Sequence, residues 1–314
     1  GQSRLAAGSG SCATELIPIF ETLRSRLAPT PSGHLHLGNA CNFLLTWALV
    51  RSRGGQLWLR VDDLDATRAK PEFLESLFRD LDWLGLDWDS GPEGPEEVRK
   101  TSSQQLRLDR YEAALSQLRK QGDLFACNCS RKEVQLASGD GRYPGTCRSR
   151  NLDFSAPETA WRLRMPETAP VTMHGWMGAT VSADAAHVGD LVLRRRDEIP
   201  AYQITSLVDD VDHGINLIVR GADLRESSTI QLHLAERLKN VSFLQTRFLH
   251  HPLLIRPDGA KLSKSQGDAT LKAMRESGTE ASVVFEKFAR WLGLPEECGA
   301  TLTDLQAAIG SDLP

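Results

Sequence analysis

The N-terminal part of the chain alternates short apolar runs with longer segments of helical periodicity. Residues 24–28 are a short strand candidate that ends in the apolar Leu27 and Ala28. A turn rich in glycine and proline separates them from residues 37–51, where apolar side chains recur at helical spacing. A second apolar run from Gln56 to Val61 follows, and Pro71 to Leu84 has the pattern of a helix with proline in its first turn. This β-α-β-α order predicts a parallel sheet.

The same alternation returns after residue 200, with candidate helices at 202–210 and 223–238 and candidate strands at 215–220 and 246–249. Residues 121–195 differ, because they hold short strand-like stretches and few long helices. We therefore expect an insertion that splits the sheet. The predicted division is a mobile extension at 1–23, the two halves of an α/β domain at 24–120 and 196–270, an inserted subdomain at 121–195 and a helical C-terminal region at 271–314.

Composition is that of an ordinary soluble protein, with 40% apolar and 25% charged residues in 314. No run of 18 apolar residues and no secretory leader pattern is present, so we expect a cytoplasmic protein without membrane contact. The net charge of −4 provides no overall basic field, and any RNA partner must bind a local patch. We take the arginines for such a patch to be Arg148, Arg150, Arg194, Arg195 and Arg196.

The turn before residues 37–51 could hold a phosphate. Gly33 and Gly38 allow close approach of the backbone, the following helix offers free N–H groups, and His36 can donate to phosphate oxygens. Alone, the turn is equally compatible with a tight strand-to-helix connection that carries a surface histidine. Near the other end, Lys261 and Lys264 follow an Asp-Gly turn, where two ammonium groups could close over a polyphosphate or simply remain solvated.

Three of the six cysteines, Cys127, Cys129 and Cys147, fall within 21 residues. This spacing does not indicate a disulfide framework. Three thiolates and one further ligand would complete a tetrahedral zinc site, although buried free cysteines are also common.

The two phosphate-binding candidates together resemble the signature pair of the class I aminoacyl-tRNA synthetases. Residues 36–39 are similar to the HIGH element, and residues 261–265 are similar to the KMSKS loop. The resemblance narrows to the glutamyl branch through residues 26–33, 60–65 and 219–224, and it covers roughly 24–270. It implies that 24–120 and 196–270 form a Rossmann-like catalytic domain with a parallel sheet, split by a zinc- and acceptor-binding subdomain at 121–195. It implies that the amino acid attacks the α-phosphate of ATP, which Mg²⁺ accompanies, and that the resulting adenylate passes the amino acid to an RNA hydroxyl.

The resemblance also implies roles for individual residues. His36 and Lys264 would stabilise the transition state, and Lys261 would assist closure of its loop. The residues implied to bind ATP are Thr30, Gly33, His36, Gly38, Asn39 and Lys264. Those implied to bind glutamate are Arg26 for the side-chain carboxylate, Asp62 for the α-amine, Arg220 for the remaining carboxylate, Tyr202 as pocket wall, and Ala28 and Thr30.

Two positions depart from the family pattern. Asp62 stands where the family usually has Glu, so the carboxylate is one methylene shorter and the preferred amino acid is an open question. Asn39 replaces the second histidine of the generic signature, as is common in the glutamyl branch. Without the motifs, Arg26, Asp62 and Arg220 would be taken for ordinary ion pairs. The neighbouring acids Asp209 and Asp210 are interpreted as scaffold beside the pocket, as helix-capping or ribose-binding residues rather than a proton-transfer dyad.

The cysteine segments resemble the zinc site of the glutamyl-queuosine tRNA(Asp) synthetases, in which a tyrosine, here Tyr143, is the fourth ligand. Only 49 residues follow Ser265, whereas full glutamyl-tRNA synthetases add a large anticodon-binding region. The resemblance thus implies a short paralogue, expected as a monomer, that transfers glutamate to queuosine in the anticodon of tRNA(Asp). The alternatives are a shortened glutamyl-tRNA synthetase, an adenylating enzyme with another amino acid or acceptor, and a non-catalytic RNA-binding paralogue.

Overall fold

The computed structural model describes residues 22–139, 142–253 and 270–312. Lys261 and Lys264 lie outside the described residues, so their expected place over ATP stays a prediction. Within the described ranges, no helix combines the length and the apolarity that crossing a membrane requires.

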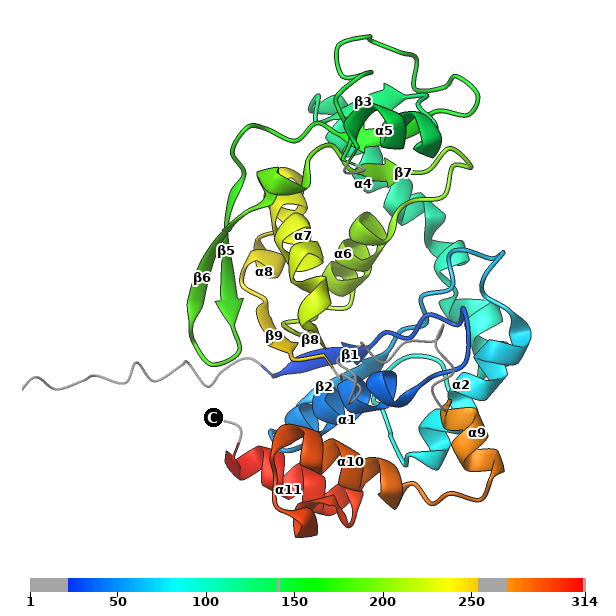
Figure 1. The fold of residues 1–314 in the computed structure, drawn as a ribbon, viewed down its shortest axis with the longest axis vertical. Helices are drawn as coiled ribbons and strands as arrows, with labels where there is room; N and C mark the ends of the chain where they lie inside the picture. Colours follow the sequence, from blue (N-terminus) through cyan, green and yellow to red (C-terminus); the bar gives the residue numbers. More distant parts are fainter. Residues whose placement is uncertain (1–21, 140–141, 254–269, 313–314) are drawn as a thin grey trace, which may run out of the picture.

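The first half of the fold has the predicted β-α-β-α order (Figure 1). Strand β1 pairs in parallel with β2, with Arg24 opposite Gln56 and Leu27 opposite Leu59. The buried side of α1, from Ala40 to Val50, packs over this pair. The elements are β1 (Arg24–Leu27), α1 (Leu37–Arg51), β2 (Gln56–Leu59), α2 (Pro71–Trp83), α3 (Pro95–Glu97), a π-helical turn (Val98–Ser102), a 3₁₀ helix (Gln104–Arg107) and α4 (Leu108–Lys120).

The second half contains the predicted helices and parallel strands after residue 200. Strand β8 pairs in parallel with β9, and β8 also lies against β1, where the backbone N–H of Asn216 donates to the carbonyl oxygen of Arg24 at 3.0 Å. The elements are α6 (Tyr202–Asp212), β8 (Leu217–Gly221), a 3₁₀ turn (Ala222–Leu224), α7 (Arg225–Leu238), α8 (Val241–Leu244) and β9 (Arg247–His251).

The range expected as an insertion is divided between two sheets. Strands β3 (Leu124–Cys127), β4 (Ala160–Leu163) and β7 (Val192–Arg194) form a small antiparallel sheet. In contrast, β5 (Pro170–Gly175) and β6 (Thr180–Asp184) extend the β8–β9 pair in the order β6-β5-β9-β8. The main sheet is therefore mixed rather than purely parallel, because β6 runs antiparallel to β5. The helix α5 (Arg131–Ser138), which sequence periodicity did not predict, and a 3₁₀ turn (Ala185–Val188) complete this region.

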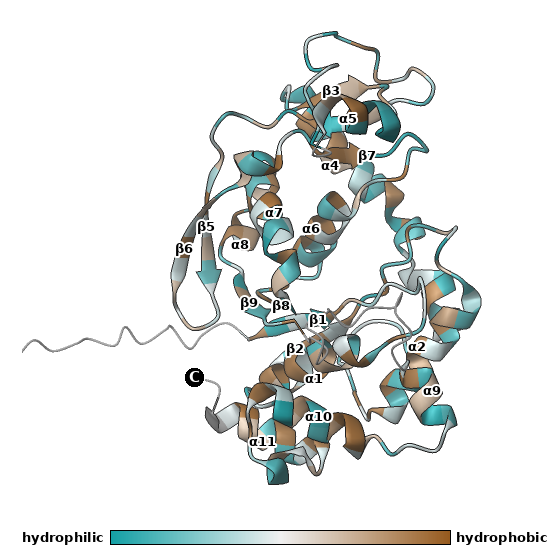
Figure 2. Cartoon of the chain, viewed as in Figure 1, coloured by the Kyte–Doolittle hydropathy of each residue, from teal (hydrophilic) through white to brown (hydrophobic). Residues whose placement is uncertain are grey.

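The C-terminal region is helical, as predicted, and it belongs to the same core as α1. The apolar sides of α10 and α11 contribute Phe285, Phe288, Leu305 and Ile309 to that core, and both helices carry hydrophobic and hydrophilic residues in Figure 2. Figure 1 shows these helices at one end of the molecule and the small sheet with β3 and β7 at the other. The elements are α9 (Leu271–Glu276), α10 (Ser282–Leu292), a 3₁₀ turn (Glu296–Gly299) and α11 (Leu302–Asp312).

Candidate active site and cysteine cluster

His36 begins helix α1 and is held there by a reciprocal cap. Its Nδ1 accepts a hydrogen bond from the backbone N–H of Gly38 at 3.1 Å, and its own N–H donates to Oδ1 of Asn39 at 3.1 Å. Because Nδ1 is an acceptor, a neutral ring carries its proton on Nε2. A Cβ atom on Gly38 would lie 3.0 Å from Cε1 of His36, so a larger residue would displace the ring. The cap thus fixes the orientation of the imidazole at the start of the helix.

Most of the predicted active-site residues that the structure describes line two neighbouring cavities. The larger, of about 630 Å³, is lined by Ala28, Thr30, Asn39, Asp62 and Tyr202 among others. The smaller, of about 230 Å³, is lined by His36, Gly38, Asn39 and Arg220 among others. Both share Asn39, Asn42 and Leu224, so they form one continuous region beside the start of α1. Two predicted residues, Gly33 and Arg26, line neither cavity.

Arg220, at the end of β8, is a buried guanidinium with unused hydrogen-bond donors. Only 3% of the residue is exposed, and its Nη1 donates to Oε1 of Gln231 on α7 at 3.0 Å. Its Nε and Nη2 are buried without a hydrogen-bond partner in the described part of the chain. Burial lowers the pKa of Arg220, and the nearby Arg26 and Arg60 act in the same direction. A buried cation with unpartnered N–H groups facing a cavity is a site for an anion.

Arg26 and Asp62 belong to a buried network organised by Arg60. Arg60 binds Asp62 with both a 2.6 Å contact from Nε and a 3.1 Å contact from Nη2, and its Nη1 reaches Oδ1 of Asp210 at 2.7 Å. Nε of Arg26 donates to the same oxygen at 2.9 Å. Burial alone would raise the pKa of Asp210, but the two arginines outweigh it and lower that pKa.

Asp62 is the member of this network that reaches the larger cavity. Its carboxylate also accepts from Nε2 of Gln104 at 3.3 Å, and burial raises its pKa despite Arg60. The carboxylate that was expected to receive the α-amine of glutamate therefore already has an arginine partner.

Asp209 and Asp210 are scaffold residues, as expected, but their expected contacts are wrong in detail. Both lie inside α6 and are fully buried, so neither caps a helix or reaches a ribose. Asp209 accepts hydrogen bonds from Gln104 at 2.9 Å, from Arg107 at 2.8 Å and from Tyr111 at 3.0 Å. The pair joins α6 to the β1–β2 region and to α4.

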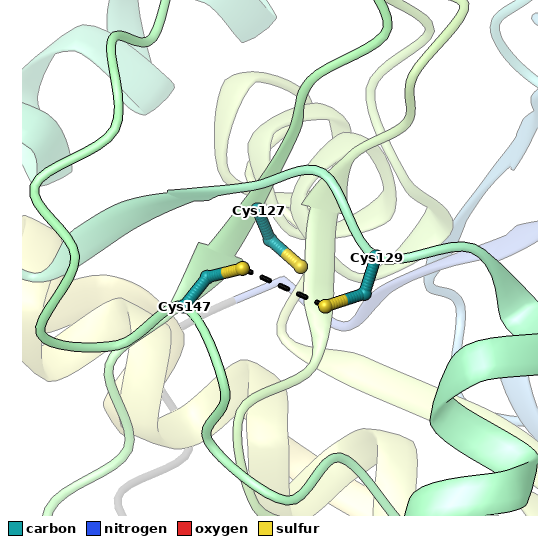
Figure 3. A group of neighbouring side chains, drawn as sticks. All are labelled: Cys127, Cys129 and Cys147. Atoms are coloured by element: carbon teal, nitrogen blue, oxygen red, sulfur yellow. Dashed lines mark hydrogen bonds between the residues drawn. The ribbon is translucent and has the colours of Figure 1, made fainter.

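The three clustered cysteines come together as a compact group beside β3 (Figure 3). Their Sγ atoms all lie within 4.8 Å of one another, and Cys129 and Cys147 are 3.5 Å apart. The hydroxyl of Tyr143 lies 3.3 Å from Sγ of Cys127 and 3.9 Å from Sγ of Cys129. Tetrahedral zinc with 2.3 Å bonds to sulfur separates its sulfur ligands by about 3.8 Å, so this donor set fits the ion.

The surroundings of the cluster shift the pKa values of its members in opposite directions, and burial raises the pKa of the Cys129 thiol to about 11. Burial would raise the pKa of the Cys147 thiol, but hydrogen bonds from Tyr143 and from the backbone of Asn128 outweigh it and lower that pKa to about 7. The guanidinium of Arg162 stacks over the Tyr143 ring at 3.8 Å. Burial and the hydrogen bonds with Cys127 and Cys147 nevertheless raise the pKa of the Tyr143 hydroxyl, so deprotonation of this ligand would depend on a bound ion.

The arginines expected to form an RNA patch are mostly engaged in ion pairs within the chain. Arg148 pairs with Asp190 at 2.9 Å, Arg196 with Glu158 at 3.2 Å, and Arg195 with Asp65 at 2.8 Å. Arg194 approaches Glu112 at 3.4 Å. These contacts neutralise much of the expected patch, so sequence clustering alone overstated its positive charge.

Sequence reasoning gave no role to three residues that shape the site. Arg60 was noted only as part of a motif, yet it connects Asp62 to Asp210. Gln104 connects Asp62 to Asp209, and Gln231 holds Arg220. The sequence carries little signal for these three residues, because a polar side chain is visible in it but the hydrogen-bond partner that the fold brings to that side chain is not.

Known proteins are similar to this chain over nearly its whole length. Residues 22–311 match the family described as tRNA synthetases class I (E and Q), catalytic domain. A protein named Glutamyl-Q tRNA(Asp) synthetase from Nitratidesulfovibrio vulgaris is 34% identical, with 90% of this chain and 92% of that protein covered. A protein of the same name from Parasynechococcus marenigrum is 39% identical, with 87% and 84% covered.

Solved structures support the same fold. The glutamate-tRNA synthetase from Elizabethkingia anophelis superposes with a TM-score of 0.74 at 22% identity, over 91% of this chain and 65% of that one. At this identity the likeness concerns the fold alone. Taken with the match over residues 22–311, it means that the chain belongs to the class I tRNA synthetase family for glutamate and glutamine, in its catalytic-domain part.

Proposed function

We propose that this protein activates glutamate with ATP as an adenylate and transfers the glutamyl group to the queuosine base in the anticodon of tRNA(Asp). The acceptor is supported by the relatives named Glutamyl-Q tRNA(Asp) synthetase, which match about nine-tenths of the chain. The observation that carries the activation step is Arg220, a buried guanidinium beside the His36 turn. Two of its nitrogens have no hydrogen-bond partner among the residues that the structure describes.

Amino-acid recognition follows from the charges around the two cavities. A carboxylate of glutamate would satisfy Nε and Nη2 of Arg220, which are buried and unpaired in the described structure. Arg26 lies close to Arg220 but is paired with Asp210, so Arg220 carries most of the positive charge that is available to the substrate. Asp62 lines the larger cavity, where its carboxylate would accept a hydrogen bond from the α-amine of glutamate.

The reaction has two balanced steps. The α-carboxylate oxygen of glutamate attacks the α-phosphorus of ATP, and pyrophosphate leaves. The queuosine hydroxyl then attacks the carbonyl carbon of the adenylate, its proton is lost and AMP leaves. The start of α1 and the capped His36 would stabilise the charge that develops on the phosphate, since both present donors at the smaller cavity.

Zinc is proposed as a structural ion. Cys127, Cys129, Cys147 and Tyr143 would hold it, and it would fix the segment after β3 against residues 143–147. Lys261 and Lys264 as catalytic cations, Mg²⁺ with ATP, a monomeric state and a cytoplasmic location remain predictions.

The acceptor is tested with radiolabelled glutamate and two preparations of tRNA(Asp), one with queuosine at the wobble position and one with guanosine. We expect label only on the queuosine form, and we expect nuclease cleavage to recover it in the anticodon fragment. Label at the 3′ end, or equal label on both preparations, would contradict the proposal and point to ordinary tRNA charging.

A further inference from the structure

A second pocket, lined by several arginines, lies beside the catalytic cavity. This arginine pocket has a volume of about 420 Å³, and its wall includes Arg131, Arg162, Arg195, Arg196, Asp197 and Cys129. Arg195 lines the larger catalytic cavity as well, so the two spaces meet at this side chain. The arginine pocket combines residues from α5, from β4 and from the loop between β7 and α6.

The four arginines are neutralised unequally. Arg195 is paired with Asp65 and Asp197, and Arg196 is paired with Glu158. Within the described ranges, neither Arg131 nor Arg162 has a carboxylate partner. Among the described residues, the four guanidinium groups are thus paired with three carboxylates. The charges of Arg131 and Arg162 remain unpaired and leave a positive potential, which an anion would relieve.

Arg162 provides a second, independent observation. Its Nη1 donates to the carbonyl oxygen of Asp190 at 2.9 Å, and its guanidinium lies over the ring of Tyr143. These two contacts fix the plane of the guanidinium. Its Nε is buried without a hydrogen-bond partner among the described residues. A rigid guanidinium with an unsatisfied donor in a positive pocket matches the geometry of a phosphate ligand.

We propose that the arginine pocket binds a backbone phosphate of the RNA substrate and so positions the anticodon loop against the catalytic cavity. The inference rests on the proposed function, because it names where that reaction holds its acceptor. The remaining lining residues, Ala160 and Val192, are apolar. Among the residues that the structure describes, no aromatic ring lines the wall, so these residues offer no stacking platform for a base. Recognition of a phosphate would fix the register of the RNA and carry no sequence information itself.

The test uses Arg131→Glu, because Arg131 is exposed and lines the arginine pocket but not the catalytic cavity. Lys132→Glu is the matched control, since it makes the same charge change at the next, exposed position of α5 and lies outside the pocket wall. Affinity for queuosine-containing tRNA(Asp) is measured over a range of salt concentrations. Pyrophosphate exchange on glutamate is measured without RNA.

We expect Arg131→Glu to weaken RNA binding roughly tenfold at low salt and to reduce the salt slope by about 1, with exchange unchanged. Lys132→Glu should change the affinity less than about threefold. An equal loss of RNA affinity in both variants, or no loss in Arg131→Glu, would overturn the proposal that this pocket binds a phosphate. If the unmodified protein fails to exchange pyrophosphate on glutamate while its RNA affinity still depends on Arg131, the proposed function fails and the phosphate site stands.

Discussion

At the scale of single residues, Arg220 and Gln231 show how the pocket keeps a cation available for substrate. Gln231 accepts one N–H of Arg220 without neutralising its charge, and its own Nε2 is buried without a partner in the described structure. A neutral amide at this position orients the guanidinium and leaves the charge for a carboxylate. This arrangement costs stability, since both groups are buried and only partly satisfied.

Gln231→Glu is therefore expected to increase stability and reduce activity. The new carboxylate would pair with Arg220 and compete with glutamate, so the KM for glutamate in pyrophosphate exchange should rise more than about tenfold. The melting temperature should stay the same or increase. Gln231→Leu, which adds no charge, should raise this KM only a few-fold, and an unchanged KM in Gln231→Glu would contradict the role given to Arg220.

Asp62 shows a limit of reasoning from sequence at this scale. The shorter side chain was visible in the sequence as a departure from the family pattern. Its partner was not predicted, because the bidentate contact depends on the conformation of Arg60, two residues away on the same segment. The same holds for Arg26, whose partner Asp210 lies 184 positions further along the chain.

At the scale of elements, the start of α1 is a part in which the packing leaves little freedom. His36 is clamped by its cap, and Gly38 leaves no room for a side chain against the imidazole. Close packing of a ring against a backbone position means that even one methyl group must move the ring.

Gly38→Ala is expected to lower the rate of pyrophosphate exchange by about tenfold, because a small displacement of a catalytic group has a large effect on rate. Gly94→Ala is the matched control, since a Cβ there meets nothing within 4 Å. Circular dichroism should show the same helical content in both variants. Equal exchange rates for the two would contradict the claim that the cap positions His36.

The cysteine cluster is the second element with a direct test. Cys147→Ser is expected to reduce the zinc content below one ion per chain, measured by metal analysis of the purified protein, and to lower the melting temperature by several degrees. Cys298→Ser makes the same change outside the cluster and should retain the metal. Zinc that remains stoichiometric after Cys147→Ser would exclude this ligand set.

Elements themselves were easier to predict than their pairing. The alternation of apolar runs and helical periodicity located most strands and helices, including α7, which was predicted at 223–238 and spans Arg225–Leu238. It did not reveal that β5 joins β9, because strand partners are set by tertiary packing and register rather than by local pattern.

At the scale of the whole molecule, buried histidines make stability depend on pH. Burial lowers the pKa of His213, His233 and His251 below their usual range, and burial next to Arg220 lowers the pKa of His250 to about 4. The unfolded chain therefore binds more protons than the folded one below pH 6.5. Stability conferred by neutral histidines is fully present above that pH and is lost as the pH falls toward 4.

Urea unfolding followed between pH 7 and pH 5 should show this loss. For His250 alone, whose side chain is only partly buried, we expect a decrease of about 1 kcal/mol in the free energy of unfolding at pH 5. His250→Gln should flatten the pH dependence by about that amount. A free energy of unfolding that increases as the pH falls over this range would contradict the assignment.

The charge of the whole molecule also limits how RNA is held. A net charge of −4 gives little long-range attraction, so binding must depend on a local concentration of cations. The sequence predicted such a patch from neighbouring arginines. Their ion pairs with acids from distant segments became visible only in the fold. In the wall of the arginine pocket, these pairs leave Arg131 and Arg162 without carboxylate partners among the described residues.

The most direct test of the central claim is ATP–pyrophosphate exchange with glutamate, aspartate and glutamine, each without RNA. We predict exchange on glutamate alone, lost in Arg220→Ala, because Arg220 presents the buried unpaired donors that a carboxylate requires. Exchange that needs tRNA, or that prefers aspartate or glutamine, would contradict the account.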